Sequence, residues 1–332
     1  PKTDASQLRP LALARHQLQT QEVTQPTSRY ELASKRPSTL RGRARKACSR
    51  FTRIGLLVQL AGLALACSTH SQVPVQASGS GIRVLSWNVS GNPVERQPIE
   101  FAALLRSADP DVLILDECSP DLDLDRLHSL LPRAESGPEW NITMGRSGGR
   151  QRTVIASRAP HRAVALLAEE VAYPEADRLE IEQRMSLEGV ANPEWRLDMG
   201  IPVHGAVIDT AEGGLLVVGM DLQCCGNELS SWEEARRRLE AEEIRRRIRL
   251  ALDDPAIDGL VVTGDLNIVG TVMPLITLTG PYGERHRSLS PAEIYHLDGT
   301  TAWTWDGRGT RFASRPMDFQ LYGSQALVIR SG

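Results

Sequence analysis

The chain has 332 residues, enough for one large or two ordinary domains with a substantial core. Its charge is unevenly divided, because residues 1–80 carry 12 Lys and Arg against 3 Asp and Glu, a net charge of +9. Subtracting these from the totals of 38 basic and 41 acidic residues leaves 26 and 38 in residues 81–332, a net charge of −12. An acidic body argues against tight nonspecific binding to a polyanion, although a bound divalent cation can reverse the field at one site.

The first 66 residues divide into a polar stretch without a sustained apolar period, a basic stretch and an apolar run. Residues 1–40 are polar and are interpreted as disordered or as sequence upstream of the true start. A basic stretch at 41–46 then precedes an apolar run at 54–66. That run is too short for a comfortable membrane span and is typical of a signal peptide, the alternative being a buried helix of the globular domain.

The residues after the apolar run favour export. Ala64-Leu65-Ala66 matches a signal-peptidase cleavage site, and Cys67 directly after it resembles a bacterial lipoprotein box. We therefore expect residues 41–67 to be a signal peptide and residues 68–80 to be a flexible linker. The protein is expected in the cell envelope or periplasm, attached to the membrane through Cys67, or secreted.

Residues 81–332 are interpreted as one domain of alternating strands and helices. Apolar runs predict strands at 82–89, 111–115, 153–157, 215–220, 259–263 and 315–322. Weaker patterns predict three further strands at 163–172, 179–187 and 201–209. Helical spacing of apolar residues predicts helices at 98–106 and 122–131.

A third helix is predicted after Ser231, which forms a capping box with Glu234. Its arginine clusters at 236–238 and 245–247 are interleaved with glutamates at helical spacing. This pattern predicts a solvated outer helix rather than a basic face for nucleic acid.

Polar residues stand at the ends of several predicted strands. In Val261–Asn267 the period-two alternation of a strand would point Asp265 and Asn267 the same way. Each such residue alone is ordinary turn chemistry, but ligand sites gather at strand ends of αβ sheets, which favours one shared site. The residues are Asn88, Glu117, Asp221, Asp265, Asn267 and, within the last strand, Asp318.

The cysteines after the predicted signal peptide are Cys118, Cys224 and Cys225. An oxidising compartment would permit a bridge between Cys118 and one of the adjacent pair. Three buried thiols are the alternative.

Four short motifs contain these strand-end residues: Leu85-Ser-Trp-Asn-Val89, Pro110-Asp-Val-Leu-Ile-Leu-Asp-Glu117, Gly264-Asp-Leu-Asn267 and Arg315-Pro-Met-Asp-Phe319. In their sequence and their order along the chain they resemble motifs of the endonuclease/exonuclease/phosphatase superfamily, which has the DNase I-like fold. The resemblance implies an α/β fold, a four-layer αββα sandwich of two mixed sheets with the site at one mouth between them.

The resemblance also implies a role for each site residue. Glu117 would be the principal ligand of Mg²⁺ or Mn²⁺, with Asn88 beside it on metal or phosphate. Asp265 would orient or deprotonate the attacking water, Asn267 would hold a phosphoryl oxygen, and Asp318 would orient a catalytic histidine.

The chain departs from the family pattern in two places. Asp221 stands where many members have His or Tyr, and an acid there donates to a phosphate oxygen only when protonated, although it could bind a second cation. The closing Ser-Asp-His motif is absent before Gly332, and none of His161, His204, His286 or His296 has a matching context. We therefore expect a chain that is incomplete at its C-terminus, or an inactive homologue.

The leading hypothesis is an exported, metal-dependent phosphoester hydrolase acting on nucleic acid, phospholipid or sugar phosphate. Its alternative is a noncatalytic surface protein that binds a phosphorylated ligand or partner. Arg150 and Arg152 are candidate substrate contacts in a flexible, basic stretch, the alternative being a solvated loop.

Overall fold

The structure is a computed structural model, and it describes residues 81–90, 92–133, 139–226, 228–283, 288–296, 301–310 and 313–323. The expectations for residues 1–40, 41–67 and 68–80 lie outside the described residues, as does the chain after Gly323.

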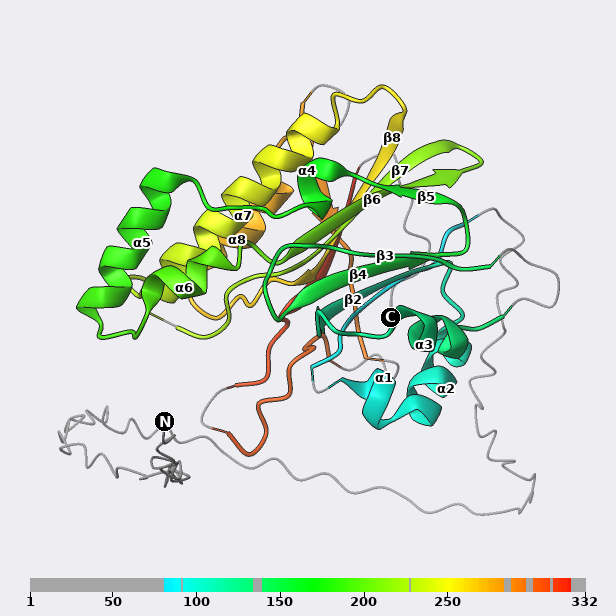
Figure 1. Ribbon diagram of the computed structural model, residues 1–332, viewed down its shortest axis with the longest axis horizontal. Helices are drawn as coiled ribbons and strands as arrows, with labels where there is room; N and C mark the ends of the chain where they lie inside the picture. Colours follow the sequence, from blue (N-terminus) through cyan, green and yellow to red (C-terminus); the bar gives the residue numbers. More distant parts are fainter. Residues whose placement is uncertain are drawn as a thin grey trace, which may run out of the picture. The chain divides into compact units, whose positions relative to one another are not determined.

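Two sheets form the centre of the described domain (Figure 1). The first has the strand order β1-β2-β4-β3, in which β1 and β2 are parallel and the other pairs antiparallel. Its strands are β1 Val84–Asn88, β2 Val112–Cys118, β3 Asn141–Met144 and β4 Arg152–Ser157.

The second sheet has the order β5-β6-β7-β8-β10-β9, and β7 and β8 are its parallel pair. Its strands are β5 His161–Ala163, β6 Val203–Thr210, β7 Gly213–Asp221, β8 Ile257–Asp265, β9 Leu289–Pro291 and β10 Asp318–Gly323. Both sheets are therefore mixed.

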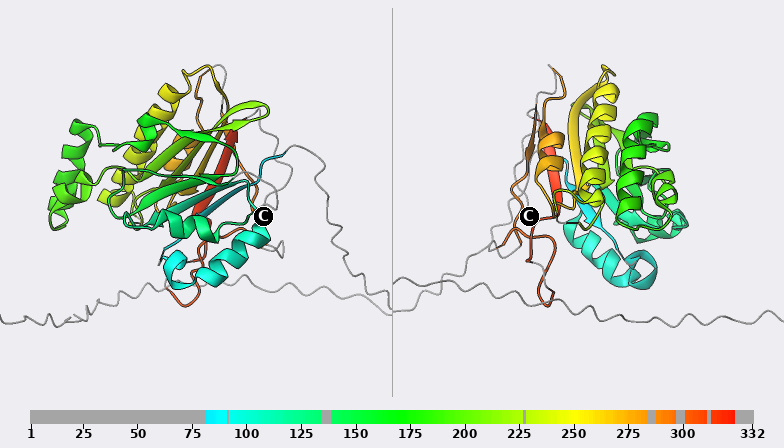
Figure 2. Two further views of the ribbon diagram at one scale, coloured as in Figure 1. Left: turned by 45° about the vertical axis from the view of Figure 1, so that its right-hand side comes forward. Right: turned by 90° about the vertical axis from the view of Figure 1, so that its left-hand side faces the viewer.

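Helices cover the outer face of each sheet (Figure 2). The first sheet is covered by α1 Pro93–Arg96, α2 Pro98–Ala108 and α3 Leu124–Leu130. The second is covered by α4 Ala165–Ala168, α7 Trp232–Ala251 and α8 Met273–Thr279, while α5 Glu175–Leu187 and α6 Pro193–Asp198 pack further out.

The alternation of β2 shows how the layers are separated. Leu113 and Leu115 point outward to Phe101 and Leu105 of α2, whereas Ile114 points inward to the second sheet and contacts a core that includes Val217. A strand that is apolar on both faces must lie between two layers. The buried residues accordingly form three cores, one between the sheets and one under each helical layer, which confirms the expected αββα sandwich.

Two of the weaker strand predictions are wrong. Residues 165–168 and 175–187 form α4 and α5, and only the prediction for 201–209 matches a strand, β6. In α5 the buried residues are Ile181 and Met185, four positions apart on one helical face. The alternation of Leu179 and Ile181 was misleading, because Leu179 is exposed to solvent.

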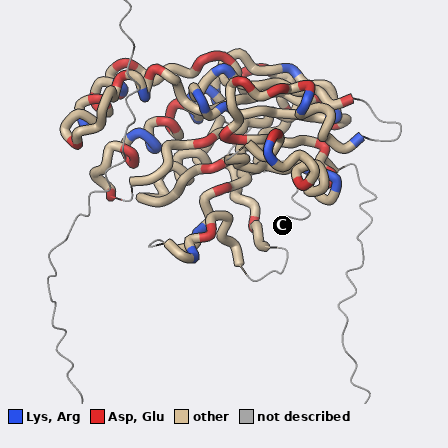
Figure 3. The backbone as a smooth tube through the Cα atoms, turned by 60° about the horizontal axis from the view of Figure 1, so that its bottom comes forward, with Lys and Arg blue, Asp and Glu red and all other residues tan. Residues whose placement is uncertain are grey.

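Helix α7 is not the solvated helix that its composition predicts. Ser231 caps it by accepting from the Glu234 N–H at 3.2 Å, but the Glu234 carboxylate pairs with Arg237 instead of completing the capping box. Arg237 and Glu234 are fully buried, and Arg236 binds Glu240 in a second buried pair at 2.8 Å. Figure 3 shows acidic and basic residues interspersed along the described chain, and their sequence spacing alone does not reveal which pairs are buried.

No helix in the described part of the chain is long and apolar enough to cross a membrane.

Candidate active site

Strand register brings the predicted site residues to one edge of the two sheets. Asn88, the last residue of β1, lies opposite Asp116 in β2. In the other sheet Asp265, the last residue of β8, lies between Asp221 of β7 and Asp318 of β10. The ends of these strands therefore meet at one mouth between the sheets.

A glycine allows the close approach of β7 and β8 at this edge. Gly264 has a φ of +134°, and a Cβ on it would lie 1.9 Å from the Met220 carbonyl oxygen. Only glycine adopts this backbone region without strain. Gly264 is therefore required for the position of Asp265, the next residue.

Glu117 reaches the site through an irregularity in β2. The pairing of β2 with β4 shifts between Leu115 and Cys118, and Glu117 has a φ of +58°. Regular alternation would turn Glu117 toward the outer helices with Leu115. The bulge adds one residue and redirects the Glu117 side chain toward Asn88.

Asn88 joins the two principal carboxylates. Its Nδ2 donates to Glu117 Oε1 at 2.9 Å and to Asp265 Oδ2 at 3.2 Å, and its Oδ1 accepts from the Ser90 N–H at 3.1 Å. One amide thus holds carboxylates from both sheets side by side. The roles expected for Asn88 and Glu117 at a metal stay predictions.

The site is electrostatically crowded. Burial and the charge of Asp318 raise the pKa of Asp265 to about 7, against the opposing effect of its hydrogen bonds from the Asn267 N–H and Asn88. Burial also raises the pKa of Asp318. Because like charges resist ionising together in a buried site, this cluster favours a bound proton or a bound cation.

Asp116 was not singled out from the sequence, although it adjoins the cluster. It continues the inward-facing set of Val112 and Ile114, is fully buried, and accepts from Thr153 Oγ1 at 2.7 Å. Burial raises its pKa well above the ordinary value, which disfavours the charged form of the carboxyl. The sequence signal that could have identified Asp116 is its period-two spacing from Val112 and Ile114, which places it on the inward face of β2.

Asp221 and Asn267 form a buried pair beside the carboxylates. Asn267 Nδ2 donates to Asp221 Oδ1 at 3.3 Å and to the Leu222 carbonyl at 2.8 Å, while its backbone N–H donates to Asp265 Oδ1. Asn267 and Asp265 therefore bond to different partners, and their expected common direction stays a prediction. Both Nδ2 protons are engaged within the protein, and the phosphoryl-holding role of Asn267 stays a prediction. Burial and the neighbouring carboxylates, Asp265 first, raise the pKa of Asp221, and its binding of a second cation stays a prediction.

The two predicted arginine contacts lie in different surroundings. Arg150 is exposed in the turn before β4. Arg152 begins β4, opposite Cys118 in β2, and lines a pocket beside the site.

The histidines lie in other contacts. His161 and His204 both bond Thr143 Oγ1, at 3.0 and 2.8 Å, and His161 also bonds Ser157 Oγ at 2.7 Å. His286 lies outside the described residues. His296 bonds the Trp303 carbonyl.

The three cysteines among the described residues, Cys118, Cys224 and Cys225, are free. Cys118 is buried, whereas the Sγ atoms of the exposed Cys224 and Cys225 lie 3.0 Å apart. The expectation of three buried thiols is therefore wrong for the adjacent pair.

Fold and site together define an αββα protein with an acidic, amide-clamped site where strands of both sheets end. The Endonuclease/Exonuclease/phosphatase family model matches residues 85–332, and the chain belongs to this family. No curated protein matches the sequence.

Solved structures with similar coordinates have low sequence identity. Truncated Caenorhabditis elegans TDP2 has 16% identity and a TM-score of 0.45, with 73% of this chain and 84% of that chain covered. A β-hairpin deletion mutant of Staphylococcus aureus beta toxin has 14% identity and a TM-score of 0.48, covering 76% and 91%. The 3′ phosphatase NExo from Neisseria, bound to a product DNA hairpin, has 15% identity and a TM-score of 0.47, covering 74% and 88%.

The donor set of this site fits a hard divalent cation. The charged neighbours that most affect the pKa values of Asp116, Asp221 and Asp265 are all carboxylates. Within the described residues no three His, Cys, Asp or Glu side chains are arranged to hold a metal ion. Mg²⁺ does not require three, because it is commonly bound by one or two carboxylates together with waters and substrate phosphate. Glu117 and Asp265 supply two carboxylates.

Proposed function

We propose that the protein is a phosphoester hydrolase that depends on Mg²⁺ or Mn²⁺, with Glu117 as the principal protein ligand of the cation. The observation that carries this proposal is the Asn88 amide, which joins Glu117 and Asp265 across the mouth between the two sheets. When bound, the cation polarises the phosphoryl group and neutralises charge that develops as water attacks.

The residues of the chain then orient the attacking water and hold its proton. Asp265, whose pKa burial and Asp318 raise to about 7, is suited to exchange a proton near neutral pH. Asn88 fixes the Oδ2 atom of Asp265, and the Asn267 N–H fixes the Oδ1 atom at 2.8 Å. Asp265 is therefore already oriented before substrate arrives.

Hydrolysis of bis-p-nitrophenyl phosphate by the full-length protein tests the proposal. We expect release of p-nitrophenol with Mg²⁺ or Mn²⁺ and none with EDTA. Glu117→Gln should lower the metal-dependent rate at least a hundredfold, about 2.7 kcal/mol of transition-state stabilisation. The control Glu175→Gln makes the same change at an exposed position of α5 and should leave the rate unchanged. Near-full activity of Glu117→Gln would refute the assignment.

The alternative is a homologue that binds a phosphorylated ligand without catalysis. Its supporting observation is that the Asn267 side-chain amide, which was expected to hold a phosphoryl oxygen, already donates to Asp221 and to the Leu222 carbonyl. The same assay separates the two, because the alternative gives no turnover with either cation.

Export also belongs to the proposal, supported by the basic stretch and apolar run before Cys67. Attachment to a membrane through Cys67 would place the full protein in the membrane fraction, and Cys67→Ala would release it. Equal fractionation of the two proteins would refute lipid attachment and leave secretion.

A further inference from the structure

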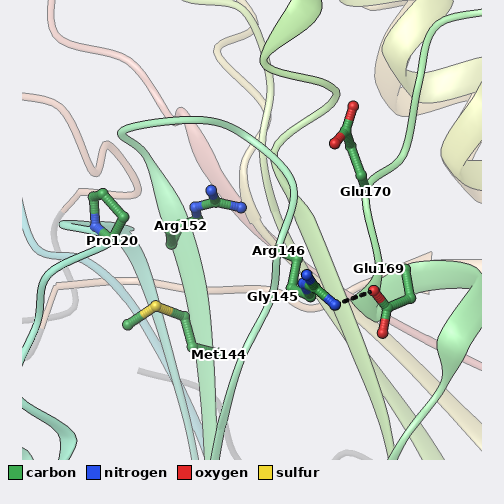
Figure 4. Close-up of a pocket in the computed structure, with 7 residues that line it drawn as sticks. All are labelled: Pro120, Met144, Gly145, Arg146, Arg152, Glu169 and Glu170. Atoms are coloured by element: carbon green, nitrogen blue, oxygen red, sulfur yellow. Dashed lines mark hydrogen bonds and ion pairs between the residues drawn. The ribbon is translucent and has the colours of Figure 1, made fainter.

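A pocket of about 660 Å³ lies beside the candidate active site (Figure 4). It is bounded by Pro120 after β2, by the segment 144–146 at the end of β3, and by Glu169 and Glu170 after α4. Arg152 enters it from the first position of β4, opposite Cys118 and thus one residue from Glu117 in the pairing of β2. The register of β2 and β4 thus places the pocket next to the end of β2 that carries Glu117.

Arg152 lines the pocket and carries one donor without a partner. Its Nη1 atom is buried and has no hydrogen-bond partner among the described residues. Burial lowers the pKa of its guanidinium, and the charge of Glu170 offsets part of this effect. A guanidinium binds oxyanions such as phosphate well, because its planar donors match two oxygens at once.

Arg146 differs from Arg152 although both line the pocket. Arg146 Nη1 donates to Glu169 at 2.9 Å in an exposed ion pair, so its charge is already compensated. The glutamates oppose a second bound anion. The pocket is therefore suited to one phosphate, and Arg152 is its donor.

The remaining walls are suited to a base. Figure 4 shows Pro120 and Met144 on one side of Arg152 and the two glutamates on the other. A methionine thioether and a proline ring offer an apolar surface to the flat face of a base. The Glu170 carboxylate is an acceptor for the N–H donors on the pairing edge of an unpaired base, which are amino groups in adenine and cytosine and the N3–H in thymine.

We propose that this pocket binds the nucleotide adjacent to the reacting phosphodiester of a single-stranded nucleic acid, with its phosphate on Arg152. This inference rests on the proposed function, because it names the substrate class of the same site. A single strand is required, since a base must be unpaired to leave its stack and enter a pocket.

Binding of a fluorescein-labelled single-stranded dT12 in EDTA, measured by anisotropy at several salt concentrations, tests the proposal without turnover. Arg152→Gln should raise Kd about tenfold and reduce the slope of log Kd against log salt by about 0.7, the value for one lost phosphate contact on a single strand. Arg152→Lys keeps the charge but not the planar fork and should give an intermediate Kd.

Two controls assign any loss to the pocket. Arg196→Gln removes an exposed arginine from α6 and should leave Kd within twofold of the parent protein. Arg150→Gln removes the exposed arginine two positions before Arg152, itself a candidate substrate contact, and should raise Kd less than Arg152→Gln does. Equal effects of Arg150→Gln and Arg152→Gln would assign binding to the loop and overturn the proposal.

The ligand is tested with matched probes. An abasic 12-mer and a duplex of the same length should each bind at least fivefold more weakly than dT12. Equal binding of the duplex, equal competition by inorganic polyphosphate, or no binding of dT12 would overturn the nucleotide assignment. Failure of the proposed function is seen separately, as absent metal-dependent hydrolysis of bis-p-nitrophenyl phosphate.

Discussion

Gly264→Ala should destabilise the domain strongly. The added Cβ would lie 1.9 Å from the Met220 carbonyl oxygen, whereas real Cβ contacts are essentially never below 3.0 Å, so β7 and β8 must move apart by about 1 Å. A glycine-only backbone region costs an alanine about 1–3 kcal/mol, and overpacking adds about 1–3 kcal/mol. We therefore expect Gly264→Ala to lower the free energy of unfolding by about 4 kcal/mol. The strained pair, Met220 and Gly264, directly precedes the pair of Asp221 and Asp265 in the register of β7 and β8.

Thermal unfolding compared with Gly189→Ala tests this reasoning. Gly189 also has a positive φ, +74°, but a Cβ there meets nothing within 4 Å. Gly189→Ala should therefore lower the free energy of unfolding by only about 1 kcal/mol. At about 2–4 °C per kcal/mol for a domain of this size, Tm should fall by about 10 °C in Gly264→Ala and by about 3 °C in Gly189→Ala. Equal shifts in the two variants would show that the contact with Met220 is not what requires glycine.

Three further perturbations have defined outcomes. Asn88→Ala removes two contacts to charged acceptors and should lower metal-dependent hydrolysis at least tenfold, about 1.4 kcal/mol, and an unchanged rate would contradict the clamp. Burial lowers the pKa of His204 from 6.5 to about 4, so between these pH values the unfolded chain binds a proton at His204 and the folded protein does not. Stability should fall by about 3 kcal/mol as pH drops from 6.5 to 4, and His204→Gln should flatten this loss in urea unfolding, whereas parallel pH profiles would contradict the assignment. Arg237→Met leaves Glu234 buried without its partner and should lower the free energy of unfolding by about 3–5 kcal/mol. The double variant with Glu234→Leu should recover much of this loss, and equal losses in the single and double variants would refute the pairing.

The sequence predicted the elements whose apolar pattern has only one explanation. The strands that became β2, β7 and β8 are apolar runs buried on both faces, and such runs have few alternatives in a domain of this size. The α5 segment was mistaken for a strand because Leu179 and Ile181 alternate, and nothing local shows which of the two is buried.

The electrostatic environment was less predictable than the strand ends. The meeting of Asn88, Glu117 and Asp265 followed from their positions after predicted strands. The burial of Arg237 could not be predicted in this way, because an interleaved charge pattern is the same on a solvated helix and on a helix that packs against a loop. Arg237 Nε donates to the Gln223 carbonyl at 2.8 Å, a contact that depends on tertiary structure alone.

The bulge in β2 has a consequence for insertions and deletions in this chain. Deleting Asp116 would restore regular alternation, move Glu117 into the position between the sheets and leave Cys118 facing outward among the same apolar neighbours. Every packing contact of β2 up to Leu115 would survive, while the acid that meets Asn88 would be lost. A reading frame shortened by a single codon would thus keep the architecture and erase the chemistry, although no substitution had occurred.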